Sequence, residues 1–393
     1  MLRLLPALLL ISACTSATVD YSAVWESAQE LGGVVRLDKA QLQAFQGEDE
    51  SNLPYAVDAE GNVLVSQPLV DDHGHWSALL VAAEDRNKIA AFEWVLPANY
   101  PEFDSQVQVY LGKRNEVGSY ESKPRETRPA DHRAQPGGSD YLYQAEGPIW
   151  ENDLIGFRNY FDERNGFDIF GKTKPDFAAQ EIGITGNYHE LQHWGMDVLK
   201  VGSSLGAGAL GISKADTLYP IGEAAVEHFQ QLAYGPLMAS FELQYEELEN
   251  FPGITIYRTI SILAGLPGYL TENHLSGGSD EQLTTGIVTL HSDNFLERQA
   301  AEFSRFATHG PQAELDKHLG MAIVTTTAAD SGHSPEAAAP VTTTYFVRPQ
   351  TERSLDYLFL AGWELQDASY TDESVFLEKV DHWAAQYAAW TNH

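Results

Sequence analysis

Cysteine is nearly absent from this sequence, because Cys14 is the one cysteine in 393 residues. A single cysteine cannot form a disulfide bond within its own chain, so a disulfide-stabilised fold is excluded. The N-terminal apolar run of residues 4–11 is also far shorter than the ~20 residues that span a bilayer. We therefore expect that this run does not cross a membrane.

Positive charge is scarce as well. The chain has 24 Lys and Arg against 56 Asp and Glu, which gives a formal net charge of -32. Such a chain repels nucleic acids and anionic bilayer surfaces, so we predict no nucleic-acid partner. An anionic ligand would have to meet a local cluster of cations.

The N-terminus has the pattern of an export signal that ends at a cysteine. Arg3 precedes the apolar run, and two small residues stand directly before Cys14. Bacterial lipoprotein processing recognises this arrangement, so we predict a signal peptide of residues 1–13 and a lipid anchor on Cys14 as the sole membrane contact. Thr15 favours the outer membrane facing the periplasm, with the cell surface as a second location. In the alternative, the signal is an ordinary secretory one with a chance cysteine.

Short apolar runs between turn residues predict strands over most of the chain. These runs are residues 62–70, 76–83, 89–97, 106–111, 241–246, 254–262, 282–290 and 342–347. Residues 14–51 are expected to form a tether and lead-in with a short helix over residues 21–31. Residues 52–393 are expected to form one β-sandwich domain, interrupted by a long exposed loop at about residues 113–140.

The C-terminus has the spacing of an amphipathic helix. Its apolar residues recur every three or four positions, at Phe376, Val380, Trp383, Ala384 and Tyr387. Thr371 or Asp372 is a suitable cap, and Glu373 follows in the first turn. The sequence therefore predicts a mainly β chain, a large antiparallel β-sandwich with a C-terminal helix.

Residues 147–212 have the composition of a ligand site. Aromatic rings that could stack on sugars occur at Trp150, Tyr160 and Trp194. Cations within this acidic chain occur at Arg158, Arg164, Lys172 and Lys200. Arginine binds carboxylates through two parallel hydrogen bonds, so the combination favours an acidic sugar. In the alternative, the arginines pair internally with Asp162, Glu163 or Asp168, and the aromatic residues fill the core.

The string from His189 to His193 matches the H-E-x-x-H pattern of zinc peptidases, with Glu190 as the residue that would activate water. This chemistry requires a helix that places both histidines on one face. Glycine before the string and Trp194 with Gly195 directly after it disfavour such a helix. We therefore favour His189, beside Tyr188, as an acid–base group in a sugar cleft.

Four strings in this region resemble a bacterial family known as domain of unknown function 4861, over roughly residues 52–388. They are residues 147–153, 156–162, 168–172 and 194–202. The family occurs in gene clusters that degrade ulvan and pectin. The resemblance implies a galactose-mutarotase-like supersandwich and an activity similar to that of ulvan oligosaccharide dehydratases. Such an enzyme removes water from a non-reducing-end uronic acid and leaves a 4,5-unsaturated uronate.

Elimination from a uronate needs a cation at its carboxylate, a base at C5 and an acid at the leaving oxygen. We expect Arg158 or Lys172 to bind the carboxylate. His189 and Tyr188 are the predicted acid and base, in unassigned order. No cofactor is predicted, and a divalent metal stays an alternative.

Adjacent residues of a strand face opposite sides, so Tyr188 and His189 can cooperate only in a loop or twisted segment. If they diverge, His228 or Tyr160 becomes the partner. Arg258 is expected to be either a core ion pair or a second carboxylate clamp. Two further functions stay open: a non-catalytic glycan-binding lipoprotein, and a glycoside hydrolase. Carboxylates that could serve the hydrolase are Glu151, Asp153 and Asp162.

Overall fold

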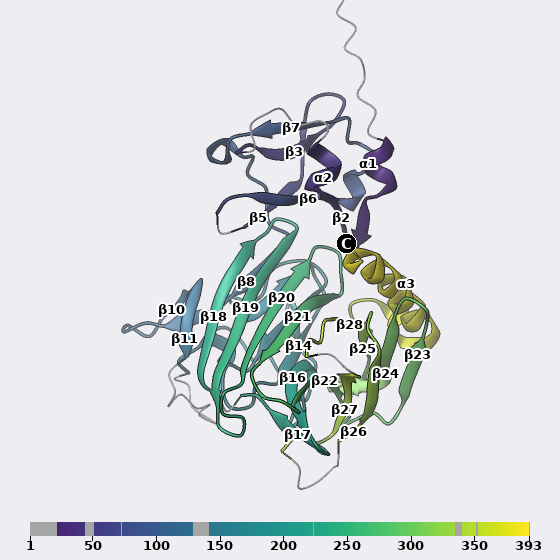
Figure 1. Cartoon of the computed structure of the whole chain (residues 1–393). Helices are drawn as coiled ribbons and strands as arrows, with labels where there is room; N and C mark the ends of the chain where they lie inside the picture. The colour runs from purple at the N-terminus through teal and green to yellow at the C-terminus, as the bar shows by residue number, and fades with distance from the viewer. Residues whose placement is uncertain are drawn as a thin grey trace, which may run out of the picture.

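The computed structural model describes residues 22–43, 51–71, 73–128, 141–222, 224–334, 340–350 and 353–392. The predicted signal peptide and Cys14 lie outside these residues. Strand residues greatly outnumber helical residues in the described chain, and the strands pair in antiparallel sheets, which confirms the mainly β prediction (Figure 1). No helix in the described ranges is long and apolar enough to cross a membrane.

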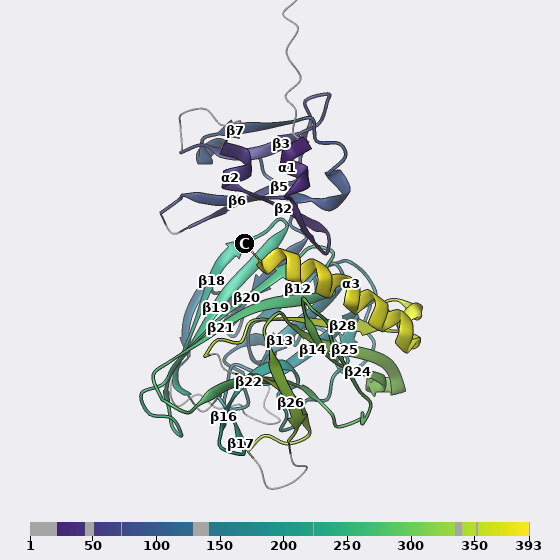
Figure 2. The same cartoon turned by 45° about the vertical axis from the view of Figure 1, so that its right-hand side comes forward.

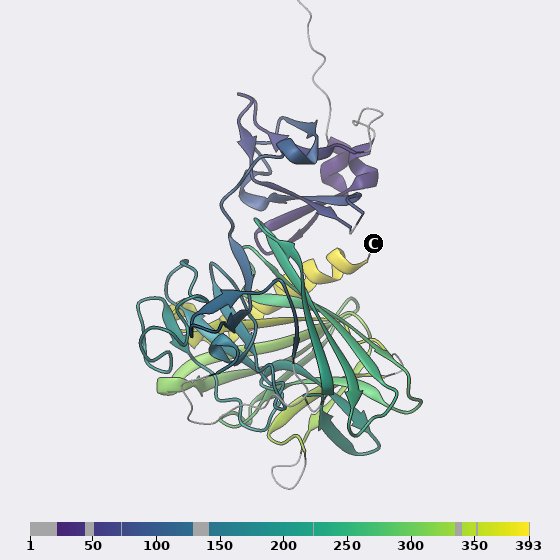
Figure 3. The ribbon, with the colours of Figure 1, turned by 90° about the vertical axis from the view of Figure 1, so that its left-hand side faces the viewer.

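A small N-terminal domain precedes the large one (Figure 3). It has two sheets, with strand orders β1-β2-β6-β5 and β4-β3-β7. Its elements are α1 (Ser22–Glu26), β1 (Gln29–Leu31), β2 (Val34–Asp38), α2 (Lys39–Leu42), β3 (Leu53–Val57), β4 (Val63–Leu64), β5 (Ser66–Val70), β6 (Trp76–Ala82) and β7 (Ala91–Val95). The described part of the expected tether, residues 22–43, is therefore folded. The helix predicted over residues 21–31 is short, because Gln29–Leu31 pairs with β2.

Strand alternation in this domain also attaches it to the rest of the molecule. On β6, Leu79 and Val81 join the core of the small domain, whereas Leu80 and Ala82 join that of the large domain. The Gly33 amide donates to the Ala264 carbonyl at 2.9 Å, beyond the end of β20. Both contacts fix the small domain against the large sheet.

The large domain is built on a nine-stranded sheet of order β11-β18-β19-β20-β21-β28-β25-β24-β23. Its strands are β11 (Arg125–Arg128), β18 (Ala224–Tyr234), β19 (Met238–Leu248), β20 (Thr255–Leu263), β21 (Gly268–Ser276), β23 (Phe295–Gln299), β24 (Ser304–Ala313), β25 (Lys317–Thr325) and β28 (Tyr357–Trp363). The alternation predicted over residues 241–246 and 254–262 lies in β19 and β20. In these strands most apolar side chains face the core and most polar ones face outward, with Arg258 of β20 as a buried exception.

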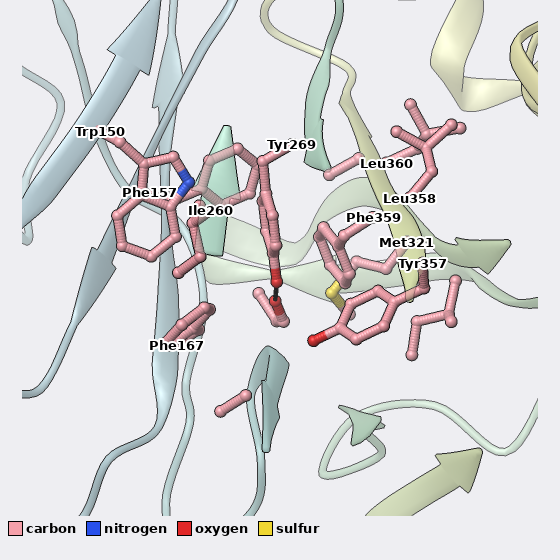
Figure 4. Close-up of a cluster of buried hydrophobic side chains, with 14 of the residues drawn as sticks. Trp150, Phe157, Phe167, Ile260, Tyr269, Met321, Tyr357, Leu358, Phe359 and Leu360 are labelled. Atoms are coloured by element: carbon pink, nitrogen blue, oxygen red, sulfur yellow. Dashed lines mark hydrogen bonds between the residues drawn. The ribbon is translucent and has the colours of Figure 1, made fainter. Parts of the chain in front are cut away.

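Two five-stranded sheets cover the inner face of the nine-stranded sheet, which makes a sandwich. The first contains β8 (Val107–Tyr110), β12 (Ile149–Asn152), β13 (Ile155–Asn159), β14 (Phe167–Lys172) and β15 (Gly195–Asp197). The second contains β16 (Ala207–Lys214), β17 (Thr217–Pro220), β22 (Gln282–Val288), β26 (Ala329–His333) and β27 (Thr344–Pro349). Buried aromatic rings fill the space between the layers, among them Trp150, Phe157 and Tyr269 (Figure 4).

The loop predicted at residues 113–140 is wrong for part of its length. Its described residues contain β10 (Tyr120–Ser122), which pairs with β9 (Gly112–Arg114), and β11 at the edge of the large sheet. Such polar edge strands lack the apolar alternation by which sequence analysis detects strands. Residues 129–140 lie outside the described ranges.

The C-terminal helix is confirmed as α3 (Glu373–Thr391), which packs on the outer face of β24, β25 and β28 (Figure 2). Asp372 is the cap, because its side chain accepts hydrogen bonds from the Ser374 and Val375 amides. The predicted apolar face is buried at Phe376, Val380, Ala384 and Tyr387.

Candidate functional site

Three charged side chains meet on the outer face of the β8/β12–β15 sheet. Arg158 of β13 is directly opposite Asp168 of β14, and Asp197 lies on the neighbouring β15. Their strand neighbours Phe157 and Ile169 point into the core. The period of two therefore places the charged set on the opposite face.

Arg158 is buried and ion-paired. The side chain is 1% exposed and contacts the carboxylates of Asp168 and, at 3.4 Å, Asp197. It also donates to the Tyr160 hydroxyl at 2.8 Å. Burial, followed by the Asp197 charge, raises the pKa of Asp168. Arg158 is thus a counter-ion for protein carboxylates, and its predicted role as a clamp for the substrate carboxylate is wrong.

Lys172 is also committed to internal partners. Its ammonium lies 2.8 Å from the Glu151 carboxylate and 2.6 Å from the Asn152 carbonyl, and its side chain is 1% exposed. A buried cation is tolerated only when it is paired in this way. The predicted positive pocket does not form from Arg158 and Lys172, because each is neutralised where it lies.

Tyr188 and His189 do lie side by side, as the predicted acid–base pair requires. Their ring centroids are 4.3 Å apart, in a turn rather than a strand. Gly186 begins this turn with a φ of +69°, a conformation that favours glycine. The Asp197 amide donates to the Tyr188 carbonyl at 2.8 Å, which fastens the turn to β15.

A charged side chain contacts each residue of this pair: Asp197 contacts His189, and Arg158 contacts Tyr188. The His189 Nδ1 lies 3.4 Å from the Asp197 carboxylate, and this contact raises the pKa of His189 above 6.5. The Tyr188 hydroxyl accepts a hydrogen bond from Arg158 at 3.4 Å. Burial raises the pKa of Tyr188, and the Arg158 charge opposes that rise. The His189 side chain is 62% exposed, so a ligand can reach it.

Arg164 and Tyr160 border this pair. The Arg164 guanidinium lies 3.9 Å from the centre of the Tyr160 ring and pairs with Asp162 and Glu146. The Tyr160 hydroxyl donates to Asp168 at 3.0 Å. The internal pairing considered for both arginines is therefore confirmed. We call this group of side chains the Arg158 cluster; its members are Arg158, Arg164, Glu146, Asp162, Asp168, Asp197, Tyr160, Tyr188 and His189.

The zinc arrangement is not formed. The string from His189 to His193 lies in turns and coil, not on a helix. His193 Nε2 faces Glu181 at 3.5 Å, whereas His189 faces Asp197. Within the described part of the chain, no three His, Cys, Asp or Glu side chains are grouped to hold a metal ion.

Several other predicted ligand residues are structural or lie elsewhere. Trp150 is fully buried against Phe157 and Tyr269, so its role as a sugar platform is wrong. Trp194 is likewise buried, against Phe170. Lys200 is exposed on the coil that follows β15.

Arg258 and His228 belong to β20 and β18 of the large sheet. Arg258 is a core residue whose guanidinium donates to the Tyr357 hydroxyl at 2.7 Å and the Gly208 carbonyl at 2.9 Å. It is thus not a clamp for a ligand carboxylate and forms no ion pair among the described residues; neutral oxygens solvate it instead. His228 faces outward from the sandwich, remote in topology from the turn of Tyr188.

The carboxylates considered for a glycoside hydrolase are engaged in structural contacts. Glu151 accepts from Lys172 and from the Ala178 and Ala179 amides. Asp162 pairs with Arg164, and the Asp153 carboxylate accepts from the Gly265 amide at 3.1 Å.

Sequence reasoning missed Asp197 and Glu146 as members of the site. Asp197 stands in the string of residues 194–202, which carries the family resemblance, so a signal for it existed. Its contact with His189 depends on the fold of the intervening turn. Glu146 lies just before β12 and has a φ of +67°, and no sequence pattern marks it as a site residue.

Comparisons with known proteins give the family but no activity. A protein in the glycosyl hydrolase family 38 from Enterococcus faecalis has a TM-score of 0.43 at 9% identity, over 92% of this chain and 45% of that one. An alpha-mannosidase from Enterococcus faecalis V583 has a TM-score of 0.41 at 10% identity, over 92% and 44%. The chain thus spans less than half of each structure, and neither likeness assigns it a reaction. No curated protein matches it significantly. The family described as "Domain of unknown function (DUF4861)" matches residues 28–389, and the chain belongs to that family.

Proposed function

We propose that the chain is a carbon–oxygen lyase that removes water from the non-reducing-end uronic acid of ulvan-type oligosaccharides. The observation that carries the proposal is the pair of adjacent rings, His189 and Tyr188, each backed by an opposite charge. Proton transfer within an elimination creates an imidazolium and a phenolate. Asp197 and Arg158 are placed to stabilise these two ions.

His189 is assigned as the base. Neutral His189 takes the C5 proton, the C5–H electrons form the C4–C5 double bond, and the C4–O bond breaks. The Asp197 carboxylate stabilises the imidazolium that results. Because this contact raises the pKa of His189, the imidazole is a stronger base than an isolated histidine.

Tyr188 is assigned as the acid. Its raised pKa keeps the hydroxyl protonated at neutral pH, so it can give a proton to the departing C4 oxygen and release water. Arg158 lies beside the hydroxyl and favours the phenolate that remains. The phenolate then regains its proton from the imidazolium, directly or through water, which restores both groups.

The substrate carboxylate is assigned to Arg164. Its side chain is 37% exposed, in contrast to the buried Arg158 and Lys172. We propose that a uronate competes with Glu146 for this guanidinium. No cofactor takes part in this route.

The location proposed for this activity is the cell envelope. We retain the proposal that Cys14 carries a lipid after removal of residues 1–13, with the protein at the outer membrane facing the periplasm or at the cell surface. Substrate would then be the oligosaccharides present in that compartment.

Product analysis tests the proposed reaction. Incubation with saturated ulvan oligosaccharides that end in glucuronic or iduronic acid is expected to produce an absorbance typical of 4,5-unsaturated uronates. Mass spectrometry is expected to show the loss of one water without cleavage of the chain. Shortened oligosaccharides without unsaturation would instead indicate a hydrolase and contradict the proposal.

The pH dependence of the reaction follows from the Asp197 contact. The rate is expected to rise with pH through the pKa of His189, because the base must be neutral. In Asp197→Asn the stabilisation of the imidazolium is lost, so the pKa of His189 falls and the rising limb moves to lower pH. NMR titration of the His189 ring checks the shift directly. An unchanged His189 titration would contradict the assigned contact.

A further inference from the structure

A second surface of the sandwich has the features of a ligand site, on the side opposite the Arg158 cluster. It is the outward face of β18–β21, where strand register aligns polar side chains in rows. One row runs from His228 through Gln244 and Tyr257 to His274. These residues are at least partly exposed, while their strand neighbours face the core.

Cavities follow this face. One of about 610 Å³ lies over β11, β18 and β19. Its lining includes Arg125, Thr127, His228, Gln230, Glu242 and Gln244. Thr127 Oγ1 contacts His228 Nδ1 at 2.9 Å, which fixes the ring and leaves Nε2 without a partner among the described residues. Hydrogen-bonding side chains, with the His228 ring held in one orientation, therefore form the floor of this cavity.

A second cavity of about 610 Å³ lies further along β18 and β19; Ser240 of β19 lines it, and Glu242, two residues along the same strand, lines the first. Its walls come from β5 and residues 100–105 on one side and from the ends of β18 and β19 on the other. Tyr100, Phe103 and Tyr234 supply aromatic rings, and Tyr234 is 63% exposed. A third cavity of about 150 Å³ shares Leu69 and Met238 with it. We call these three cavities together the outer groove.

The outer groove is long, open and acidic. β18 and β19 have 11 residues each, which gives a length of ~35 Å. The charged residues that line the three cavities are five glutamates and two arginines: Glu102, Glu126, Glu242, Glu246, Glu272, Arg36 and Arg125. This charge repels anionic chains, so the uronates assigned to the Arg158 cluster do not fit here.

We propose that the outer groove binds an extended chain of neutral sugars. Amide, hydroxyl, carboxylate and imidazole groups match sugar hydroxyls, which both donate and accept hydrogen bonds. Tyr234 lines the groove, and Tyr257, 37% exposed, lies beside Gln244 at its border; both offer flat faces to the apolar faces of sugar rings. A basic peptide would also satisfy the charge. However, extended peptides bind at sheet edges through main-chain pairing, whereas this floor consists of side chains on a sheet face.

The inference takes the class of ligand, a carbohydrate, from the proposed function, but its test is separate because it measures binding alone. Calorimetric titration of the full chain with cellohexaose, xylohexaose and mannohexaose is expected to show saturable binding of at least one. Gln244→Ala and Tyr257→Ala are each expected to weaken it about tenfold, as the loss of one good contact does. Gln299→Ala, an exposed glutamine on β23 at the far edge of the same sheet, is the matched control and should leave it unchanged.

His189→Gln should also leave neutral-sugar binding unchanged, which separates this inference from the proposed reaction. The proposal is overturned if none of the three hexasaccharides binds or if both groove variants bind as well as the parent. It is also overturned if hexagalacturonate or tetralysine binds more tightly than every neutral sugar.

Discussion

Replacing His189 with glutamine is expected to reduce formation of the unsaturated uronate by ~10²–10⁴-fold, the usual contribution of a positioned base. Glutamine has a similar reach and can keep a hydrogen bond to Asp197, but it cannot accept the C5 proton. Because the His189 side chain is 62% exposed, its loss leaves no cavity in the core. The melting temperature should stay close to that of the parent, while initial rates on uronate-ended oligosaccharides collapse.

His193→Gln is the matched control. This histidine lies in the same segment, is 59% exposed and also faces a carboxylate, Glu181. Its imidazole lacks a neighbouring tyrosine backed by arginine, so the rate should not change. The rate of Tyr188→Phe should also fall, as that of His189→Gln does, because phenylalanine cannot protonate the leaving oxygen. Full activity in His189→Gln, or an equal loss in His193→Gln, would disprove the assignment.

Replacing Arg158 with methionine is expected to lower the free energy of unfolding by ~3–5 kcal/mol near neutral pH, the cost of breaking a buried ion pair from one side. Methionine fills a similar volume, so the loss is electrostatic. It leaves Asp168 and Asp197 buried at 0% and 3% exposure without their shared cation. Urea unfolding followed by tryptophan fluorescence measures the change.

The direction in which the stability loss of Arg158→Met changes with pH distinguishes an electrostatic cause from lost packing. Without Arg158, the folded-state pKa of Asp168, which burial and the Asp197 charge already raise, rises further above the unfolded value. Such groups contribute stability in the protonated form, at low pH, and lose it as pH rises through the folded-state pKa. The deficit of Arg158→Met should therefore shrink in acid. Arg164→Met, in which a partly exposed and solvent-screened pair is lost, should cost no more than ~1 kcal/mol. A deficit that is independent of pH would indicate lost packing instead.

Local pattern was sufficient for much of the scaffold. The period of two over residues 241–246 and 254–262 gave strands with the correct buried faces, because alternation is a property of the strand itself. The C-terminal helix and its aspartate cap could be predicted for the same reason. The scarcity of Lys and Arg in the sequence does not reveal where each cation lies in the fold, so the positive pocket predicted from Arg158 and Lys172 was wrong.

The small domain shows a second kind of failure. Strands β1 and β2 are short; β1 pairs with β2, and the other partner of β2, strand β6, lies some 40 residues further along the chain. A short segment of this kind becomes a strand only because a distant partner supplies its hydrogen bonds. Residues 14–51 therefore resembled a tether until the pairing was known.

The sequence by itself determined the strand-rich composition, the helix at the C-terminus, the negative charge and the family, since these depend on residue types and their local spacing. Only the tertiary structure decided which side chains face one another. Strand register set Asp168 against Arg158, and the turn at Gly186 brought Tyr188 and His189 above Asp197. Contacts between residues far apart in sequence arise from closing the whole sandwich, and local spacing contains no record of them.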